Sequence, residues 1–167
     1  MTDGPQRYLF TALHAAQQAG YHPLAGHILA DLAFQAATRE HASDAVALGT
    51  AAADIAAGSP VGVRASVQTR LAYGYALAGD FDDFERAYGT ALDIVADHDP
   101  GEEPAWMYYL TPNHLDTQAG YALTHAGTLA TAAGDHRVGT ALFRRGERLL
   151  RTGAHDLPTD HPAQRRA

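Results

Sequence analysis

The sequence predicts an all-α protein built from about seven helices that pack as antiparallel pairs. Hydrophobic residues make up 46% of the 167 residues, yet only 8% are aromatic, and alanine is the commonest of them. Such a composition suits helices in close contact better than a sheet. In most segments the apolar residues recur at spacings of three and four, the period of an amphipathic helix. No alternating apolar stretch is long enough to indicate a strand.

The clearest pair of helices lies around residues 71–92, on which the rest of the chain is patterned. The first helix carries Leu71, Tyr75 and Ala78 on one face, and the second carries Phe81, Phe84, Tyr88, Ala91 and Val95. Gly79 suits the left-handed position that ends a helix, and Asp80 can cap the helix that follows. Two helices joined by so short a turn pack antiparallel, as in a tetratricopeptide-like repeat.

The same kind of turn occurs at Gly20-Tyr21 and at Gly134-Asp135, 59 residues before and 55 residues after the central one. The expected helices cover residues 5–19, 23–38, 43–57, 61–78, 81–97, 114–133 and 137–152. Helix 43–57 is then an additional helix between the first two pairs, and Ser43 is its expected N-cap.

The rest of the chain is a long irregular segment and a tail. Residues 97–113 hold three of the eight prolines, the only tryptophan and two tyrosines. A connection of this length in a helical domain is either functional or packed down by its own aromatic side chains. Its acidic residues, including Glu102-Glu103, are expected to form a solvated rim. We expect one domain over residues 1–152, a right-handed solenoid segment with a concave side, and a polar, proline-rich tail over 153–167.

Charge and composition exclude several classes of function. The formal net charge is −7 and the pI is about 5.7, whereas a domain that binds phosphate backbones is usually basic, so direct nucleic-acid binding is not expected. The lack of cysteine excludes disulfides and thiolate metal sites. No apolar run approaches a membrane helix and the N-terminus has no signal-peptide pattern, so we expect a cytoplasmic protein without membrane contact. No P-loop, dinucleotide-binding glycine pattern or Gly-x-Ser-x-Gly elbow occurs, so no cofactor is expected.

Two stretches of the chain resemble a known family. One pattern consists of Asp99-Pro100, Trp106, Tyr109, Leu115 and Gly120, followed by a Gly-Asp turn and a helix rich in alanine and leucine. Together with Leu13–Ala37, it resembles the C-terminal tetratricopeptide-like (TPR-like) region of actinomycete helix-turn-helix (XRE-type) transcriptional regulators. The resemblance covers most of residues 6–152. It implies a helical region that senses a peptide, a small molecule or a protein partner. Because no helix-turn-helix segment precedes Tyr8, direct DNA binding is not carried over from the family, and the chain is either a fragment or the product of a gene that keeps only the repeat region.

Four residues are the candidates for a ligand site: Tyr73, Trp106, Tyr109 and His114. Tyr73 and Tyr75 stand two apart on one helix and face different sides. Because Tyr75 belongs to the inward ridge, Tyr73 is the better candidate for a concave surface. Trp106 and Tyr109 offer large contact areas that suit a pocket wall. The alternative is that the aromatic residues of the long segment only fill the gap beneath it.

Other polar side chains are expected near the same groove. His114 and His125 share a helix face about 16 Å apart, too far for one metal but suitable for lining one groove. Arg64 and Arg70 stand on the helix of Tyr73. An arginine in a groove pairs well with a carboxylate or a phosphate, although most surface arginines are only solvated.

The ten histidines are the most unusual feature of the composition. His27 and Asp31 stand four apart on one helix, with His14 and His22 near them across the first turn. Two histidines and a carboxylate can bind a divalent metal. No HExxH or HxH spacing supports such a site, so no metal is predicted.

Three functions remain open from the sequence. The first is a ligand- or peptide-binding sensor or regulatory module, whose groove is lined by the first helix of each pair and roofed by residues 97–113. The second is a small enzyme that uses histidine and tyrosine as acid and base on a secondary metabolite. The third is a protein–protein scaffold, a homodimer through an exposed helix face. The basic side of residues 144–151 would suit an acidic partner or a dimer mate.

Overall fold

The computed structural model describes residues 4–96, 103–107 and 110–154. Within these residues the chain forms seven α-helices and one 3-10 turn, and no strand. The elements are α1 Gly4–Gln18, α2 His22–Thr38, α3 Ala42–Ile55, α4 Val61–Ala78, α5 Phe81–Ala96, η2 Ala105–Met107, α6 Pro112–Ala132 and α7 His136–Ala154. The all-α class is confirmed, and every predicted helix is present with its ends shifted by two residues or fewer. Because α7 ends at Ala154, it includes the first two residues of the predicted tail; the remainder lies outside the described part.

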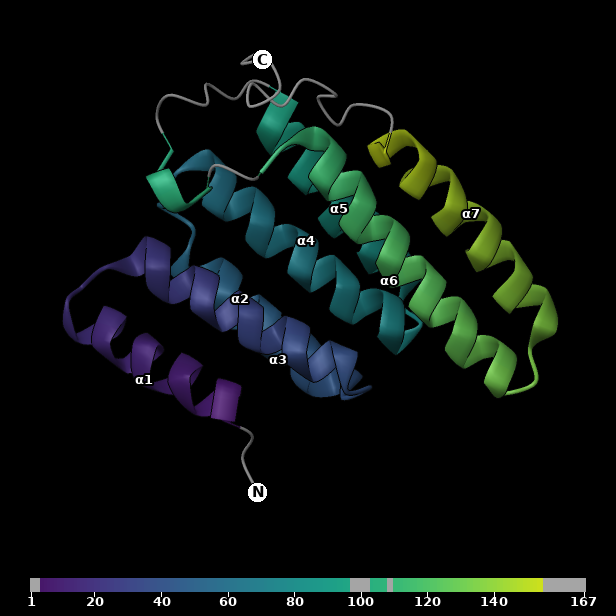
Figure 1. The fold of residues 1–167 in the computed structure, drawn as a ribbon, viewed down its shortest axis with the longest axis horizontal. Coiled ribbons are helices and arrows are strands. Elements are labelled where there is room, and N and C mark those ends of the chain that lie inside the picture. The colour runs from purple at the N-terminus through teal and green to yellow at the C-terminus, as the bar shows by residue number, and fades with distance from the viewer. Residues whose placement is uncertain (1–3, 97–102, 108–109, 155–167) are drawn as a thin grey trace, which may run out of the picture.

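Three helices lie side by side in the middle of the molecule. Figure 1 shows α2, α4 and α6 in one layer, with α1 at one edge and α7 at the other. Helix α3 packs behind α2 and α4, and α5 packs behind α4 and α6. The most extensive contacts between consecutive helices join α2 with α3, α4 with α5, and α6 with α7. Residues 43–57 therefore pack most extensively on α2, and not as the expected additional helix between two pairs. Among the described side chains of α1, those of Leu9, Leu13 and Ala16 pack against the hydrophobic core.

Helix α4 is the central element of the core, since it contacts α2, α3, α5 and α6. The largest fully buried side chains are Phe84, Met107, Leu115, Leu123, Val63 and Val67. The predicted inward ridges are confirmed for Val63, Val67, Leu71, Phe84, Tyr88, Ala91 and Val95, all of which are buried. The expectation that Tyr75 rather than Tyr73 points inward is wrong, because Tyr73 is buried, with 6% of its surface exposed, and Tyr75 is only half-buried. The reason is that α4 has neighbours on both flanks, so it has no fully solvated face.

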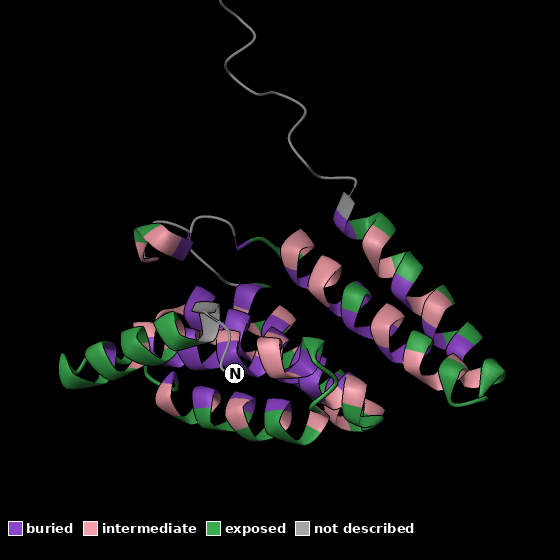
Figure 2. Ribbon diagram, turned by 60° about the horizontal axis from the view of Figure 1, so that its bottom comes forward, coloured by how far each residue is buried: buried purple, intermediate pink, exposed green. Residues whose placement is uncertain are grey.

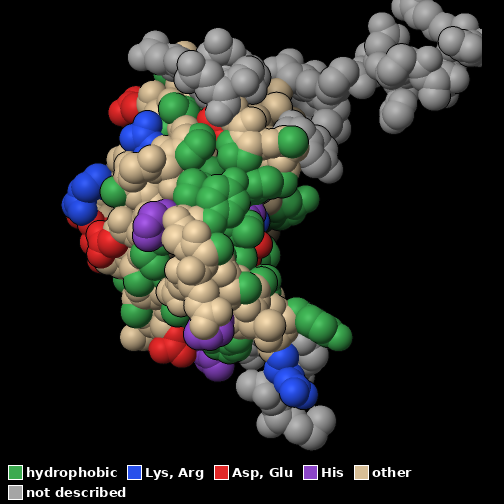
Figure 3. Space-filling view, turned by 90° about the vertical axis from the view of Figure 1, so that its left-hand side faces the viewer, with side chains coloured by type: hydrophobic (Ala, Val, Ile, Leu, Met, Phe, Trp, Pro, Cys, Tyr) green, Lys and Arg blue, Asp and Glu red, His purple; other side chains and the backbone are tan. Residues whose placement is uncertain are grey.

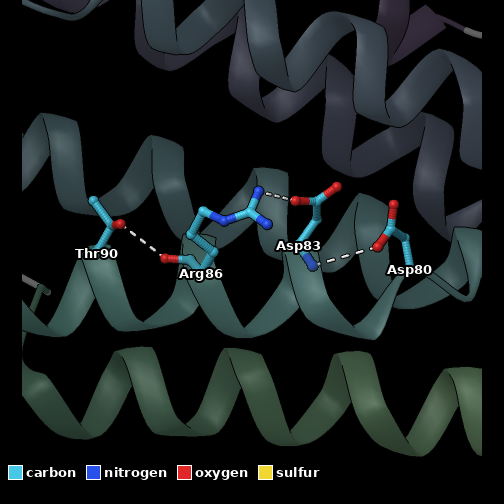
Figure 4. A network of polar contacts seen from close by, with 4 residues as sticks. All are labelled: Asp80, Asp83, Arg86 and Thr90. Carbon is cyan, nitrogen blue, oxygen red and sulfur yellow. Dashed lines mark hydrogen bonds and ion pairs between the residues drawn. The ribbon is translucent and has the colours of Figure 1, made fainter.

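The turns form as their local sequences indicate. Gly20, Gly79 and Gly134 have φ angles of 65°, 78° and 92°, the left-handed conformation that glycine adopts without steric cost. The Oδ1 atom of Asp80 accepts a hydrogen bond from the backbone N–H of Asp83 at 3.3 Å, and Figure 4 shows this cap at the start of α5. Asp135 caps α7 in the same way, at 3.0 Å. These interactions confirm the predicted ends of α4 and α6 and the predicted starts of α5 and α7.

The start of α3 differs from its prediction. The helix begins at Ala42, so His41 takes the N-cap position, and it makes no side-chain cap hydrogen bond. Ser43 lies within the first turn and is not the cap. The chain reverses earlier than expected because Glu40, rather than a glycine, adopts a positive φ of 63°.

Helices α6 and α7 approach each other through glycine. Three glycines of α7 spaced seven apart, Gly139, Gly146 and Gly153, face three threonines of α6 spaced seven apart, Thr131, Thr124 and Thr117. A Cβ atom on Gly146 would lie 2.8 Å from the carbonyl oxygen of Gly120, and one on Gly139 would lie 2.9 Å from that of Gly127. Seven residues are two helical turns, so the contact repeats along one face of each helix. No larger residue fits at these α7 positions without moving the backbone of α6.

The described part of the long segment is packed down on the core. Met107 and Leu110 are buried, and Trp106 is half-buried against the core. The Oε1 atom of Glu103 accepts a hydrogen bond from the backbone N–H of Gly62 at 2.7 Å. Glu103 is thus a half-buried anion at the N-terminus of α4, where the helix dipole favours it, and not part of a solvated rim.

Candidate functional site

Arg70 connects the three central helices. Its Nη1 atom donates a hydrogen bond to Oε1 of Gln118 on α6 at 3.0 Å, and its Nη2 atom lies 3.4 Å from Oδ1 of Asp31 on α2. The guanidinium lies over the ring of Phe34, 4.4 Å from its centroid, in cation–π geometry. The Arg70 side chain is only 15% exposed. Its charge is therefore balanced by groups of the protein itself.

Tyr73 and His125 form a second contact between α4 and α6. The hydroxyl of Tyr73 and Nδ1 of His125 are hydrogen-bonded at 3.2 Å. The Tyr73 ring also meets the Phe34 ring edge-on, with centroids 5.2 Å apart. Burial raises the pKa of Tyr73, although the Arg70 charge opposes this. The hydroxyl consequently stays protonated at neutral pH and serves as a hydrogen-bonding group.

Two hollows lie on either side of Phe34. The first has a volume of about 450 Å³ and is lined by Phe34, Tyr73, Gln118, Tyr121, Thr124, His125 and Thr128. The second has a volume of about 560 Å³ and is lined by Tyr8, Leu9, Asp31, Phe34 and Gln35. Because they share Phe34, they form one surface from α1 across α2 and α4 to α6, called the central groove below. Asp31 is the one carboxylate or cation among these lining residues, and it is paired with Arg70.

Two histidines beside Arg70 favour their neutral form. Burial lowers the pKa of His27, Arg70 adds to this, and the Asp31 carboxylate 3.8 Å away opposes it. Burial and the Arg70 charge lower the pKa of His114. The His27 ring also packs against Trp106, with centroids 5.0 Å apart. The two imidazoles therefore add no positive charge beside the groove at neutral pH.

The structure brings some of the predicted site residues together and separates others. Tyr73 lines the groove, and His114 is close enough to Arg70 to sense its charge. Trp106 packs against His27 and the core and lines neither hollow. Tyr109 lies outside the described residues. His125, predicted to line the same groove as His114, lines the first hollow.

Three residues that line the hollows were not predicted from the sequence: Phe34, Gln118 and Tyr121. Phe34 lies off the apolar stripe of α2, and an apolar side chain off the stripe signals a second contact face. Tyr121 is 54% exposed, and a single aromatic residue on a helix does not by itself indicate a contact surface. Gln118 carried no signal, because an isolated glutamine on a helix is usually solvated.

The histidine-rich first turn does not assemble a metal site in the described part of the chain. His27 and Asp31 are paired as their spacing predicts. His14 instead hydrogen-bonds Gln18 on its own helix at 2.9 Å. No group of three or more histidine, aspartate or glutamate side chains in those residues is arranged to hold a metal ion.

Comparison with protein-family models, with curated proteins and with solved structures finds no match to this chain. The resemblance to the TPR-like region of XRE-type regulators therefore stays a prediction. Among the described helices, none has both the length and the hydropathy that crossing a membrane requires.

Proposed function

We propose that this chain is a ligand- or peptide-binding module with a sensor or regulatory role, and that the central groove is its binding surface. The observation that carries the proposal is the pair of hollows flanking Phe34, walled by aromatic rings and by side-chain amides. Volumes of about 450 and 560 Å³ fall within the range of small-molecule sites. The arrangement of α2, α4 and α6 in one layer fits a TPR-like repeat whose first helices line the groove.

The proposed ligand is uncharged and carries at least one ring or apolar side chain. Arg70 already pairs with Asp31 and Gln118, so an anion gains no free cation and a cation gains no free carboxylate in the groove. Tyr121, which is 54% exposed, offers a face for stacking. A short peptide in an extended form can place two side chains in the two hollows, whereas a small molecule occupies one.

Catalysis by the Tyr73–His125 pair is the second candidate. The pair lines the first hollow, so a ligand there can touch both groups. The raised pKa of Tyr73 argues against its acting as a base at neutral pH, because the hydroxyl holds its proton. The pair is better suited to donating and accepting hydrogen bonds with a bound ligand, which favours the binding function.

The first test uses N-phenyl-1-naphthylamine, a neutral aromatic fluorophore. We expect saturable binding of one molecule to the wild-type protein. Thr128→Trp places a large ring in the first hollow and should weaken binding at least tenfold. Native mass spectrometry of protein purified from its source host then reports the mass of any natural ligand that accompanies it.

A matched control is available on α7. Thr140, like Thr128, is an exposed threonine whose hydroxyl donates to the carbonyl four residues earlier, and it lies outside the groove. Thr140→Trp should bind the fluorophore as the wild type does. Equal affinities in all three proteins would show that the groove is not the binding surface.

A further inference from the structure

A second hollow region lies on the other layer of the molecule, between α3 and α5. Both helices pack on α4 but not extensively on each other, so a cleft opens between them over α4. It has a volume of about 280 Å³ and is lined by Ala53, Ala56, Ala57, Arg64, Val67, Gln68, Thr90 and Ile94. Small alanines at the end of α3 leave the space that larger side chains would fill. This α3–α5 cleft shares no lining residue with the central groove.

Arg64 is the only charged side chain that lines the cleft, and it has no ion-pair partner among the described residues. Its Nε atom is buried and makes no hydrogen bond. The Nε atom of Arg70, six residues along the same helix, is also buried without a hydrogen bond, but the guanidinium of Arg70 has a carboxylate, an amide oxygen and an aromatic ring beside it. A half-buried guanidinium without a counter-charge gains most from an anion that enters the cleft.

We propose that the α3–α5 cleft binds a carboxylate attached to a short apolar group, with Arg64 as the partner of the carboxylate. The planar guanidinium offers parallel donors that match the two oxygens of a carboxylate. Val67 and Ile94 provide an apolar wall for a branched alkyl group, and Gln68 offers an amide beside the charge. The small volume excludes drug-sized ligands and fits a chain of about five or six carbon atoms.

Two sources can supply this chemistry. One is a free short-chain carboxylate, and the other is the C-terminal carboxylate of a peptide that ends in an apolar residue. Both place a carboxylate beside Arg64 and a branched alkyl group against Ile94. They differ in the peptide bond that joins the C-terminal residue to the rest of a peptide. Thr90 has no free hydroxyl proton for that bond, because its hydroxyl already donates to the carbonyl of Arg86, as Figure 4 shows.

The experiment is a titration of ¹⁵N-labelled protein followed by amide chemical shifts. The probes are 4-methylpentanoate for a free carboxylate, N-acetyl-leucine for a peptide end, and 4-methylpentanamide as the uncharged match. We expect saturable shifts at Ala57, Gln68 and Thr90 with at least one carboxylate, and at least tenfold weaker binding of the amide. Tighter binding of 4-methylpentanoate assigns a free carboxylate, and tighter binding of N-acetyl-leucine assigns a peptide end.

Three variants complete the test. Arg64→Gln should abolish the preference for carboxylate over amide, and Ala57→Leu, an exposed position at the cleft edge, should weaken both carboxylates. Arg144→Gln, an exposed arginine on α7, should leave both affinities unchanged. Equal binding of acid and amide to the wild type would overturn the proposal, and this measurement needs no variant to fold. The proposal would also be overturned if Arg64→Gln lowers the melting temperature but keeps the preference for carboxylate. Arg64 would then only stabilise the C-terminal end of α3 by interacting with the helix dipole.

Discussion

The two edges of the helical layer are packed by opposite means. At one edge, α7 meets α6 through glycines that bring the two backbones together, so that a Cβ atom on Gly153 would lie 2.8 Å from a carbonyl oxygen of α6. At the other edge, α1 lies on α2 through three apolar side chains while its aromatic residues face outward. Tyr8 is 78% exposed and Phe10 is 50% exposed. Figure 2 shows α1 largely in the colour of exposed residues, and Figure 3 shows hydrophobic side chains gathered on this side of the molecule.

This difference predicts a rigid edge at α7 and an edge at α1 that can adapt to a ligand. A backbone-to-backbone contact depends on shape and tolerates no added atoms, so we expect α6 and α7 to move as one body. A helix held by a few side chains opens at a lower cost in free energy and can adapt to a ligand. The adaptable helix is also the one that walls the second hollow, through Tyr8 and Leu9.

The largest expected effect breaks the α6–α7 contact. Gly146→Val forces a side chain against the backbone of α6, where even a Cβ would lie 2.8 Å from the carbonyl oxygen of Gly120. We expect a loss of at least about 3 kcal/mol in the free energy of unfolding, measured by urea denaturation. Gly89→Ala is the matched control on α5. An added Cβ there meets nothing within 4 Å, so this variant should gain about 0.5 kcal/mol.

The same substitution made at both edges compares them directly. Leu142 on α7 is 8% exposed, whereas Leu13 on α1 is only half-buried. Leu142→Ala should cost about 3 kcal/mol of global stability, and Leu13→Ala about 1 kcal/mol. Hydrogen exchange should show the Leu13→Ala effect in the amides of α1 alone. Equal losses in the two variants would mean that α1 is as firmly packed as α7.

The third prediction concerns how the stability of the protein depends on pH through two histidines beside the central groove, His27 and His114. The lowered pKa values of His27 and His114 mean that the unfolded state binds more protons than the folded state once the pH falls below about 6.5. The contribution of these groups is therefore complete above pH 6.5 and is lost as the pH falls towards their folded-state values. The expected loss is about 1.4 kcal/mol for each unit of pKa difference.

Urea denaturation between pH 7 and pH 5 measures this loss. His114→Asn should make the free energy of unfolding depend less on pH, because an asparagine side chain does not titrate. His14→Asn on α1 and His136→Asn on α7 are controls at exposed positions, and both should keep the slope of the wild type. A slope that is unchanged in His114→Asn would assign the pH dependence to other groups.

The smallest effect on stability should come from Tyr8→Ala. A side chain that is 78% exposed contributes within about 0.5 kcal/mol to folding. The same change removes a wall of the second hollow, so a ligand that spans the groove should bind at least several-fold more weakly. Fluorescence titration and thermal unfolding of one variant separate the two roles. A large fall in the melting temperature would show that Tyr8 is structural.

The local features of the fold were predictable in detail. All seven helices, the three glycine turns and the caps by Asp80 and Asp135 follow from spacing and from residues within three positions of each other. Tyr73 and His125 both line the first hollow, and the side of a helix on which a residue lies follows from the period of 3.6 residues. The start of α3 was missed, since nothing in Glu40 itself signals a positive φ.

The candidate sites depend on contacts that the sequence does not encode locally. Glu103 accepts a hydrogen bond from the backbone N–H of Gly62, 41 residues before it, and Arg70 donates to Gln118, 48 residues after it. The seven-residue repeats of glycine in α7 and threonine in α6 are visible in the sequence. Only the antiparallel alignment of the two helices shows that these glycines and threonines face each other.

The sequence by itself determined where the helices lie and where they end, because helical hydrogen bonds and caps join residues three or four apart. The tertiary structure alone decided that α2 packs more extensively on α3 than on α1, that Asp31 neutralises Arg70, and that no described carboxylate neutralises Arg64. Those outcomes depend on how helices cross. Crossing is set by the shapes of two surfaces together, and the periodicity of one helix does not specify it.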